Sequence, residues 1–160
     1  MRAIVLSDSH NNTEACEKAI NSVDKIDMII HLGDIAKDVE YLEALYFPTK
    51  VVSVLGNNDF MRQGDYERVI EFDSHRIFIC HGHTLGVSYS TARLESVARE
   101  KGCSAALYGH THVSSLKKSD DGLLLLNPGS VSRPRGDVPS FAVLETENSK
   151  LKAVIVNWVL

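Results

Sequence analysis

The sequence predicts an α/β sandwich, in which two β-sheets face each other and helices cover the outside. In the first part of the chain, short β-branched apolar runs alternate with helical patterns, as they do in βαβ units. From Ala105 onward, apolar runs are separated by turn residues such as Asp120-Asp121-Gly122, and no helical pattern intervenes. We therefore expect this later part to add strands to a second sheet.

Each apolar run is short and rich in β-branched residues, which is typical of a strand. We expect strands at residues 3–6, 28–32, 51–55, 77–80, 105–108, 123–126, 141–144 and 151–156. Apolar residues at helical spacing predict helices over 13–23, 39–45 and 90–101. The apolar faces of these helices are expected to pack in the core.

The composition is that of one globular domain. The chain has 160 residues, of which 44% are hydrophobic and 24% charged, so we expect a single domain over residues 1–160. A formal charge of -4 gives no general attraction to extended nucleic acid or to an anionic membrane. No apolar stretch is long enough for a membrane span, and the run after Met1 is too short for a signal peptide.

Cysteine usage indicates a reducing compartment. Cys16, Cys80 and Cys103 are odd in number and widely spaced, so they fit neither a disulfide framework nor a thiolate zinc site. We therefore expect the protein to be cytoplasmic.

Side chains that bind metals follow five of the predicted strands. In chain order these are Asp8 and His10, then Asp34, then Asn57, then His81, then His110 and His112. The carboxyl ends of strands are where α/β folds place their sites, so we expect these side chains to meet. Taken singly, Asp8, Asp34 and Asn57 could instead be helix caps.

This donor set predicts the kind of metal. Imidazole and carboxylate without thiolate suit Mn, Fe, Ni, Co or Zn. Seven donors exceed the needs of one ion and fill two coordination spheres if one carboxylate bridges, for which Asp34 is the candidate. His110 and His112 would face opposite sides of a regular strand, so we expect them on a loop, where Gly109 provides the break. His31 and His75 receive no chemical role.

The motifs D-x-H, G-D, G-N-x-D, H-G-H and G-H-x-H occur in this order between Asp8 and His112. Together they resemble the calcineurin-like metallophosphoesterase family, and Asn127-Pro128-Gly129-Ser130 is similar to its small bacterial and archaeal phosphodiesterase branch. The resemblance implies two facing mixed β-sheets flanked by helices, in a four-layer α-β-β-α sandwich.

The resemblance also implies a site and a reaction. One metal is held by Asp8, His10, Asp34 and His112, and the second by Asp34, Asn57, His81 and His110. Two divalent ions, Mn foremost with Ni, Fe, Co or Zn as alternatives, activate a hydroxide that hydrolyses a small phosphate ester. A phosphodiester is preferred over a monoester as the substrate.

One position departs from the family pattern. Many members have His where this chain has Asn58, and that His contacts the phosphate and protonates the leaving group. Asn58 can donate a hydrogen bond to a phosphate oxygen but cannot supply a proton, which favours diesters with good leaving groups. His83 could replace the missing acid, or it could support His81. Asp59 would orient the missing His, so its role stays open.

Several alternatives remain open at this stage. Arg133 and Arg135 could bind substrate phosphate, or they could be solvated loop residues. Trp158 and Val159 could form a subunit contact in a homo-oligomer, or they could close the core. The fold also serves as a protein-binding scaffold in the phosphoesterase-like subunit of retromer, but the complete ligand set favours hydrolysis. A nuclease for long nucleic acids would need a basic stripe that this sequence lacks.

Overall fold

Two five-stranded sheets form the centre of the molecule in the computed structural model, which describes residues 1–136 and 138–158. The first sheet has the order β10-β9-β1-β2-β3 and the second has the order β4-β5-β6-β8-β7. The strands of the first sheet are β1 (Arg2–Leu6), β2 (Met28–His31), β3 (Lys50–Ser53), β9 (Ser140–Glu147) and β10 (Lys150–Asn157). Those of the second are β4 (Glu67–Phe72), β5 (His75–Cys80), β6 (Ala105–Leu107), β7 (Ser115–Lys118) and β8 (Leu124–Asn127).

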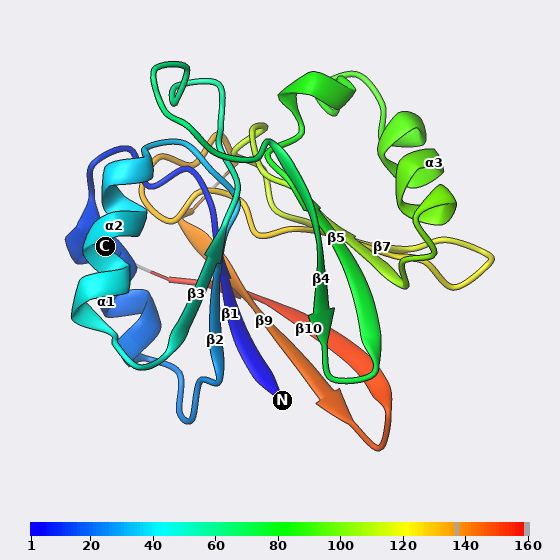
Figure 1. Ribbon diagram of the computed structural model, residues 1–160, viewed down its shortest axis with the longest axis horizontal. Coiled ribbons are helices and arrows are strands. Elements are labelled where there is room, and N and C mark those ends of the chain that lie inside the picture. Colours follow the sequence, from blue (N-terminus) through cyan, green and yellow to red (C-terminus); the bar gives the residue numbers. More distant parts are fainter. Residues whose placement is uncertain (137, 159–160) are drawn as a thin grey trace.

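Helices cover the outer face of each sheet, which gives four layers (Figure 1). Helices α1 (Thr13–Asn21) and α2 (Ala36–Leu45) pack outside the first sheet, and α3 (Ala92–Glu100) packs outside the second. A short 3-10 helix, η1 (His83–Leu85), follows β5. The predicted sandwich of two facing mixed sheets flanked by helices is therefore confirmed.

Alternating side chains distribute the core between these layers. Along β1, Ala3 and Val5 point into the cluster between the sheets, whereas Ile4 and Leu6 pack under the first pair of helices. This period of two is what a strand buried on both faces requires. The strands that carry the metal-binding motifs are consequently fixed on both sides.

Parallel pairing places the motifs at the same end of neighbouring strands in each sheet. Strands β1, β2 and β3 pair in parallel, as do β5, β6 and β8. The chain therefore leaves β1, β2 and β3 at the same end of the first sheet, and leaves β5 and β6 at the same end of the second. The five loops that follow these strands carry all seven predicted ligands.

The structure corrects the sequence prediction in two respects. Strands β4 and β7 were not predicted, because β7 is an exposed edge strand with two lysines and β4 mixes charged and apolar residues without strict alternation. Strands β9 and β10 were expected in the second sheet, but β9 pairs antiparallel with β1 and so extends the first. The β9–β10 hairpin pairs with β1, which is distant in sequence, and local sequence does not encode such long-range pairing.

Three smaller findings concern the cysteines, the last strand and membranes. Cys16, Cys80 and Cys103 are unpaired and buried. Trp158 packs edge-on against Phe141, with ring centroids 6.3 Å apart, so it helps to close the core, while Val159 lies outside the described residues. Within residues 1–136 and 138–158, no helix has the length and apolar character needed to cross a membrane.

Candidate metal centre

The predicted ligands converge on one open pocket of about 310 Å³. Its lining residues are His10, Asp34, Asn57, Asn58, His110, His112, Arg133 and Arg135. Asp8 and His81 are fully buried and contact these residues from beneath. The structure thus brings all seven sequence-predicted donors together.

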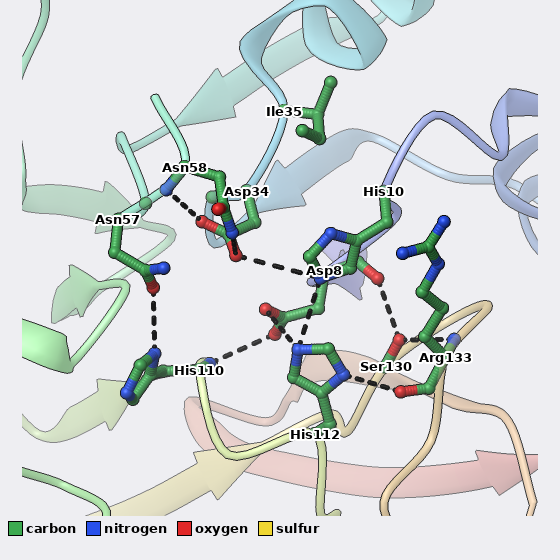
Figure 2. Close-up of polar contacts among 12 residues, drawn as sticks. Asp8, His10, Asp34, Ile35, Asn57, Asn58, His110, His112, Ser130 and Arg133 are labelled. Atoms are coloured by element: carbon green, nitrogen blue, oxygen red, sulfur yellow. Dashed lines mark hydrogen bonds and ion pairs between the residues drawn. The ribbon is translucent and has the colours of Figure 1, made fainter. Parts of the chain in front are cut away.

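Four donors form a first group. Asp8, His10, Asp34 and His112 each offer one atom, and these atoms lie within 4.8 Å of one another. Nε2 of His10 lies 3.3 Å from Nε2 of His112, which is 3.2 Å from Oδ1 of Asp8 (Figure 2). This Oδ1 is buried and makes no hydrogen bond within the described residues. A buried carboxylate oxygen facing imidazole nitrogens is a donor arrangement that suits a cation.

A second group adjoins the first. Oδ1 of Asn57 lies 3.0 Å from Nε2 of His81 and 2.9 Å from Nδ1 of His110. Nε2 of His81 is also 3.5 Å from Oδ1 of Asp34, whose Oδ2 lies 3.7 Å from Nε2 of His10 in the first group. Asp34 is therefore the carboxylate whose two oxygens face the two groups.

Contacts behind the donors hold their rings in place. The Nδ1 atom of His81 lies 2.7 Å from the carbonyl oxygen of Leu32, and that of His112 lies 2.5 Å from the carbonyl oxygen of Arg133. If each Nδ1 donates its proton to the carbonyl, each Nε2 presents a lone pair to the pocket. This is the arrangement found in metal-binding histidines.

Backbone strain is concentrated at the same residues. Asp8, His10, Asp34, His110 and His112 all have φ between +47° and +68°, in the left-handed region that non-glycine residues rarely adopt. Strained conformations persist where the surrounding structure over-determines them, and they cluster at functional sites. The left-handed turns also explain how His110 and His112 both face the pocket two residues apart.

Burial and neighbouring groups shift the pKa values of four of the donors. Burial opposes ionisation of Asp8, but the neighbouring His112, His81 and Ser7 together leave its pKa below the usual value. Burial lowers the pKa of His10 and His110, which favours their neutral, ligand-competent form. The pKa of His112 is raised, chiefly by Asp8.

Two glycines make room for the carboxylates. A Cβ on Gly56 would lie 2.1 Å from Oδ1 of Asp34. A Cβ on Gly109 would lie 2.0 Å from Oγ of Ser7 and 2.9 Å from Oδ2 of Asp8. Only a residue without a side chain permits these approaches, so the glycines beside the ligands have a steric role.

Asp59 has a role that the sequence left open. Its carboxylate is 4% exposed and accepts hydrogen bonds from the backbone N–H groups of Ile35, Ala36 and Gly56 at 3.1, 2.7 and 2.9 Å. It thereby ties the G-N-x-D loop to the start of α2. Asp59 supports the loop that carries Asn57, with no His side chain to orient.

Asn58 contacts Asp34, whereas His83 lies beside His81 and His110. Asn58 donates to Asp34 from its backbone N–H at 3.0 Å and from Nδ2 at 2.5 Å. The His83 ring lies 5.4 Å from the His81 ring and 6.1 Å from the His110 ring, between centroids. Burial lowers the pKa of His83, and its Nδ1 is buried without a hydrogen-bond partner in the described residues.

The two arginines and the Asn127-Pro128-Gly129-Ser130 motif complete the surroundings. Arg133 and Arg135 are exposed and line the pocket, and their backbone contacts His112. Ser130 donates from Oγ to the carbonyl oxygen of Asp8 at 2.8 Å, and Asn127 donates from Nδ2 to the carbonyl oxygen of Gly109 at 3.0 Å. The motif therefore fastens two of the ligand loops.

One supporting residue was missed in the sequence. Asp38 is 3% exposed and accepts hydrogen bonds from Oγ of Ser9 at 2.6 Å and from the backbone N–H of Asn11 at 2.9 Å. These contacts hold the loop between Asp8 and His10. Its only sequence signal was an acidic residue in the first turn of α2, which is common in helices without any site. His31 is also buried, and its Nε2 lies 3.1 Å from Oγ of Ser9. Its role is therefore structural.

The donor chemistry fits divalent cations. Carboxylate, amide and imidazole groups without thiolate are the donors that ions such as Mn, Fe, Ni, Co and Zn accept. Oδ1 of Asp8, buried and without a hydrogen bond in the described residues, and the nearby Nε2 atoms of His10 and His112 are donors that suit a cation between them.

Comparison with known proteins agrees with this chemistry. The calcineurin-like phosphoesterase superfamily domain model matches residues 1–149. A probable metallophosphoesterase of Methanocaldococcus jannaschii is 34% identical over 155 residues, covering 95% of this chain and 79% of the relative. A phosphodiesterase of the same organism is 26% identical over 177 residues, covering 98% of this chain and 99% of the relative.

Solved structures show the same fold. A conserved uncharacterized protein of Streptococcus pneumoniae, described as a predicted phosphoesterase, superposes with a TM-score of 0.82 at 32% identity, covering 98% of this chain and 88% of that chain. Wild-type Vps29 of Entamoeba histolytica, in complex with Zn, superposes with a TM-score of 0.75 at 22% identity, covering 98% and 99%. The latter likeness concerns the fold alone.

Proposed function

Because this chain belongs to the calcineurin-like phosphoesterase superfamily, we propose that it is a phosphodiesterase whose seven donors hold two divalent metal ions. The observation that carries the proposal is the position of the Asp34 carboxylate. Its two carboxylate oxygens face two separate groups of donors, at 3.5 Å from His81 and 3.7 Å from His10. One carboxylate between two donor groups is the arrangement that a dinuclear centre requires.

The chain's residues would divide the work as follows. Asp8, His10 and His112 would hold one ion, Asn57, His81 and His110 the other, and Asp34 both. Bound divalent ions lower the pKa of water and polarise phosphoryl oxygens, and manganese is the ion we expect. The buried outer contacts of His81 and His112 fix ring orientation, so little reorganisation is needed when substrate arrives.

Preference for a diester follows from the groups available for proton transfer. Asn58 lines the pocket where many relatives of this family place His, and an amide cannot protonate a leaving group. Its Nδ2 donates one hydrogen bond to Asp34, which leaves a second N–H for a phosphoryl oxygen. A substrate whose leaving group needs no proton is therefore favoured. Names of phosphodiesterase relatives support the same class.

His83 is assigned to support of the second group of donors. Its ring lies beside those of His81 and His110, and it does not line the pocket where substrate would sit. Arg133 and Arg135 do line the pocket, and we assign them to the phosphoryl group, whose charge their guanidinium groups complement.

The experiment that tests the function is hydrolysis of bis-p-nitrophenyl phosphate by chelator-stripped protein, with and without added Mn. Elemental analysis of the protein as purified accompanies it. We expect Mn-dependent turnover, close to two ions per chain, and a slower rate on p-nitrophenyl phosphate. Faster hydrolysis of the monoester would overturn the diester assignment, and a single ion per chain would overturn the dinuclear one.

A protein-binding scaffold is the alternative outcome, since the Vps29 fold is similar. Bound metal without turnover on any phosphate ester would favour it. We also propose a cytoplasmic setting, which the three unpaired cysteines support. A homo-oligomer stays a prediction that size measurement in solution tests.

A further inference from the structure

A second pocket adjoins the metal centre. It has a volume of about 230 Å³, and Asn58 lines both this pocket and that of the metal donors. Its apolar wall consists of Ile35, Phe60 and Met61. Phe60 and Met61 follow the G-N-x-D motif in the segment between β3 and β4, which projects beyond the sheets near the start of α2 (Figure 1).

These apolar side chains are unusually exposed. The exposed fraction is 76% for Phe60 and 85% for Met61, although each has a large surface that water solvates poorly. Single exposed apolar residues are ordinary, but here two consecutive ones line the same concavity at the mouth of a polar site. Such a surface is suited to an apolar part of a ligand whose polar part is held next door.

Ile35 is held in the wall at a cost. Its φ is +83°, a left-handed conformation that a β-branched residue very rarely adopts. Asp59 maintains it by accepting hydrogen bonds from the N–H groups of Ile35 and Ala36. Ile35 directly follows Asp34 in the chain, and Figure 2 draws both residues. The same buried carboxylate therefore supports both the ligand loop and the apolar wall.

We infer that this second pocket binds one ester arm of the substrate, and that the arm carries a planar aromatic group such as an aryl ring or a nucleobase. This inference rests on the proposed function, since the phosphoryl group must lie beside Asn58 at the junction of the two pockets. Phe60 offers a ring face for stacking, and Met61 offers a polarisable thioether. Two cationic side chains, Lys37 and Arg62, also line the pocket, and Arg62 is paired with Glu40 at 2.8 Å.

An aromatic arm suits this wall better than other occupants do. A second phosphate could pair with Lys37 and Arg62, but the apolar side chains of Ile35, Phe60 and Met61 would offer it no hydrogen bonds. A sugar would likewise lose hydrogen bonds to water there. A flat ring loses little on desolvation and gains contact with both the aromatic face and the thioether. Phe60 and Met61 are thus specificity-determining residues.

The test compares two non-hydrolysable probes, phenylphosphonate and methylphosphonate, which share the phosphonate group and differ in the ring. Binding to the Mn-loaded protein is measured by calorimetry, so the readout does not depend on turnover. We expect phenylphosphonate to bind the wild type about tenfold more tightly than methylphosphonate. In Phe60→Ala this ratio should fall to about twofold, with Met61→Ala as a second variant that should also lower it.

The matched control is Phe47→Ala. Phe47 is 84% exposed but follows the C-terminal end of α2 and does not line the pocket, so the ratio should stay at the wild-type value. An equal affinity of the wild type for both probes, or an unchanged ratio in both Phe60→Ala and Met61→Ala, would overturn the aromatic subsite alone. Failure of the loaded protein to bind either phosphonate would instead overturn the proposed function, and this inference with it.

Discussion

Asp59 is not a predicted metal ligand, but we expect removal of its carboxylate to weaken the loop that carries Asn57. It accepts three backbone N–H groups, from Ile35, Ala36 and Gly56. In Asp59→Asn, the amide oxygen can replace the oxygen shared by the first two, but the amide nitrogen then faces the N–H of Gly56. One charge-assisted hydrogen bond is lost and a buried donor is left unpaired, which costs about 2 to 3 kcal/mol.

Urea unfolding of the metal-free protein measures this difference. We expect the free energy of unfolding to fall by about 2 to 3 kcal/mol in Asp59→Asn and by roughly 4 kcal/mol in Asp59→Ala, where all three bonds are lost. Manganese affinity should fall as well, because Asn57 lies on the same loop. The control is Asp65→Asn, whose side chain is 72% exposed and which should change stability by less than about 0.5 kcal/mol. An Asp59→Asn protein within about 0.5 kcal/mol of the wild type would refute the reasoning.

The remaining predictions concern the donors themselves. Asp34→Asn should abolish turnover and lower metal content together, whereas Asn58→His should keep its metal; normal activity in Asp34→Asn would show that this carboxylate does not bridge. Gly56→Ala puts a Cβ 2.1 Å from Oδ1 of Asp34, so Mn affinity should fall at least about tenfold, while Gly136→Ala, whose Cβ meets nothing within 4 Å, should bind Mn normally. Equal affinities in these two variants would contradict the steric argument. The neighbouring carboxylate raises the pKa of His112 above 6.5, and a proton must leave this ring before it binds metal. Mn affinity should therefore rise with pH from about 6.5 upward. The metal-free protein should lose stability over the same pH range, because protonated His112 stabilises the fold only below its raised pKa. Calorimetry across pH 6 to 8 checks the affinity, and a constant value would disprove the competition with a proton.

The sequence alone determined the layers of the fold and the identity of the seven donors that now meet in one pocket. Short continuous apolar runs marked strands such as β1, whose alternating residues fill two different cores. The polar residues that directly follow those runs could be placed at one edge, because parallel strands end together. These signals are local in sequence, so they could be recognised without knowledge of the tertiary structure. Which of the donors bind an ion stays a prediction.

Only the tertiary structure decided how the site is built around those donors. Sheet membership of β9 and the link from Asp59 to the start of α2 depend on contacts between segments far apart in the chain. Strand β7 forms by pairing with the nearby β8, which its exposed, charged residues did not signal. The left-handed φ of Ile35 had no sequence signal, because local preference disfavours it and only the surrounding contacts maintain it. Sequence periodicity records which residues a strand or helix buries, whereas strain and long-range hydrogen bonds arise only when the whole chain has packed.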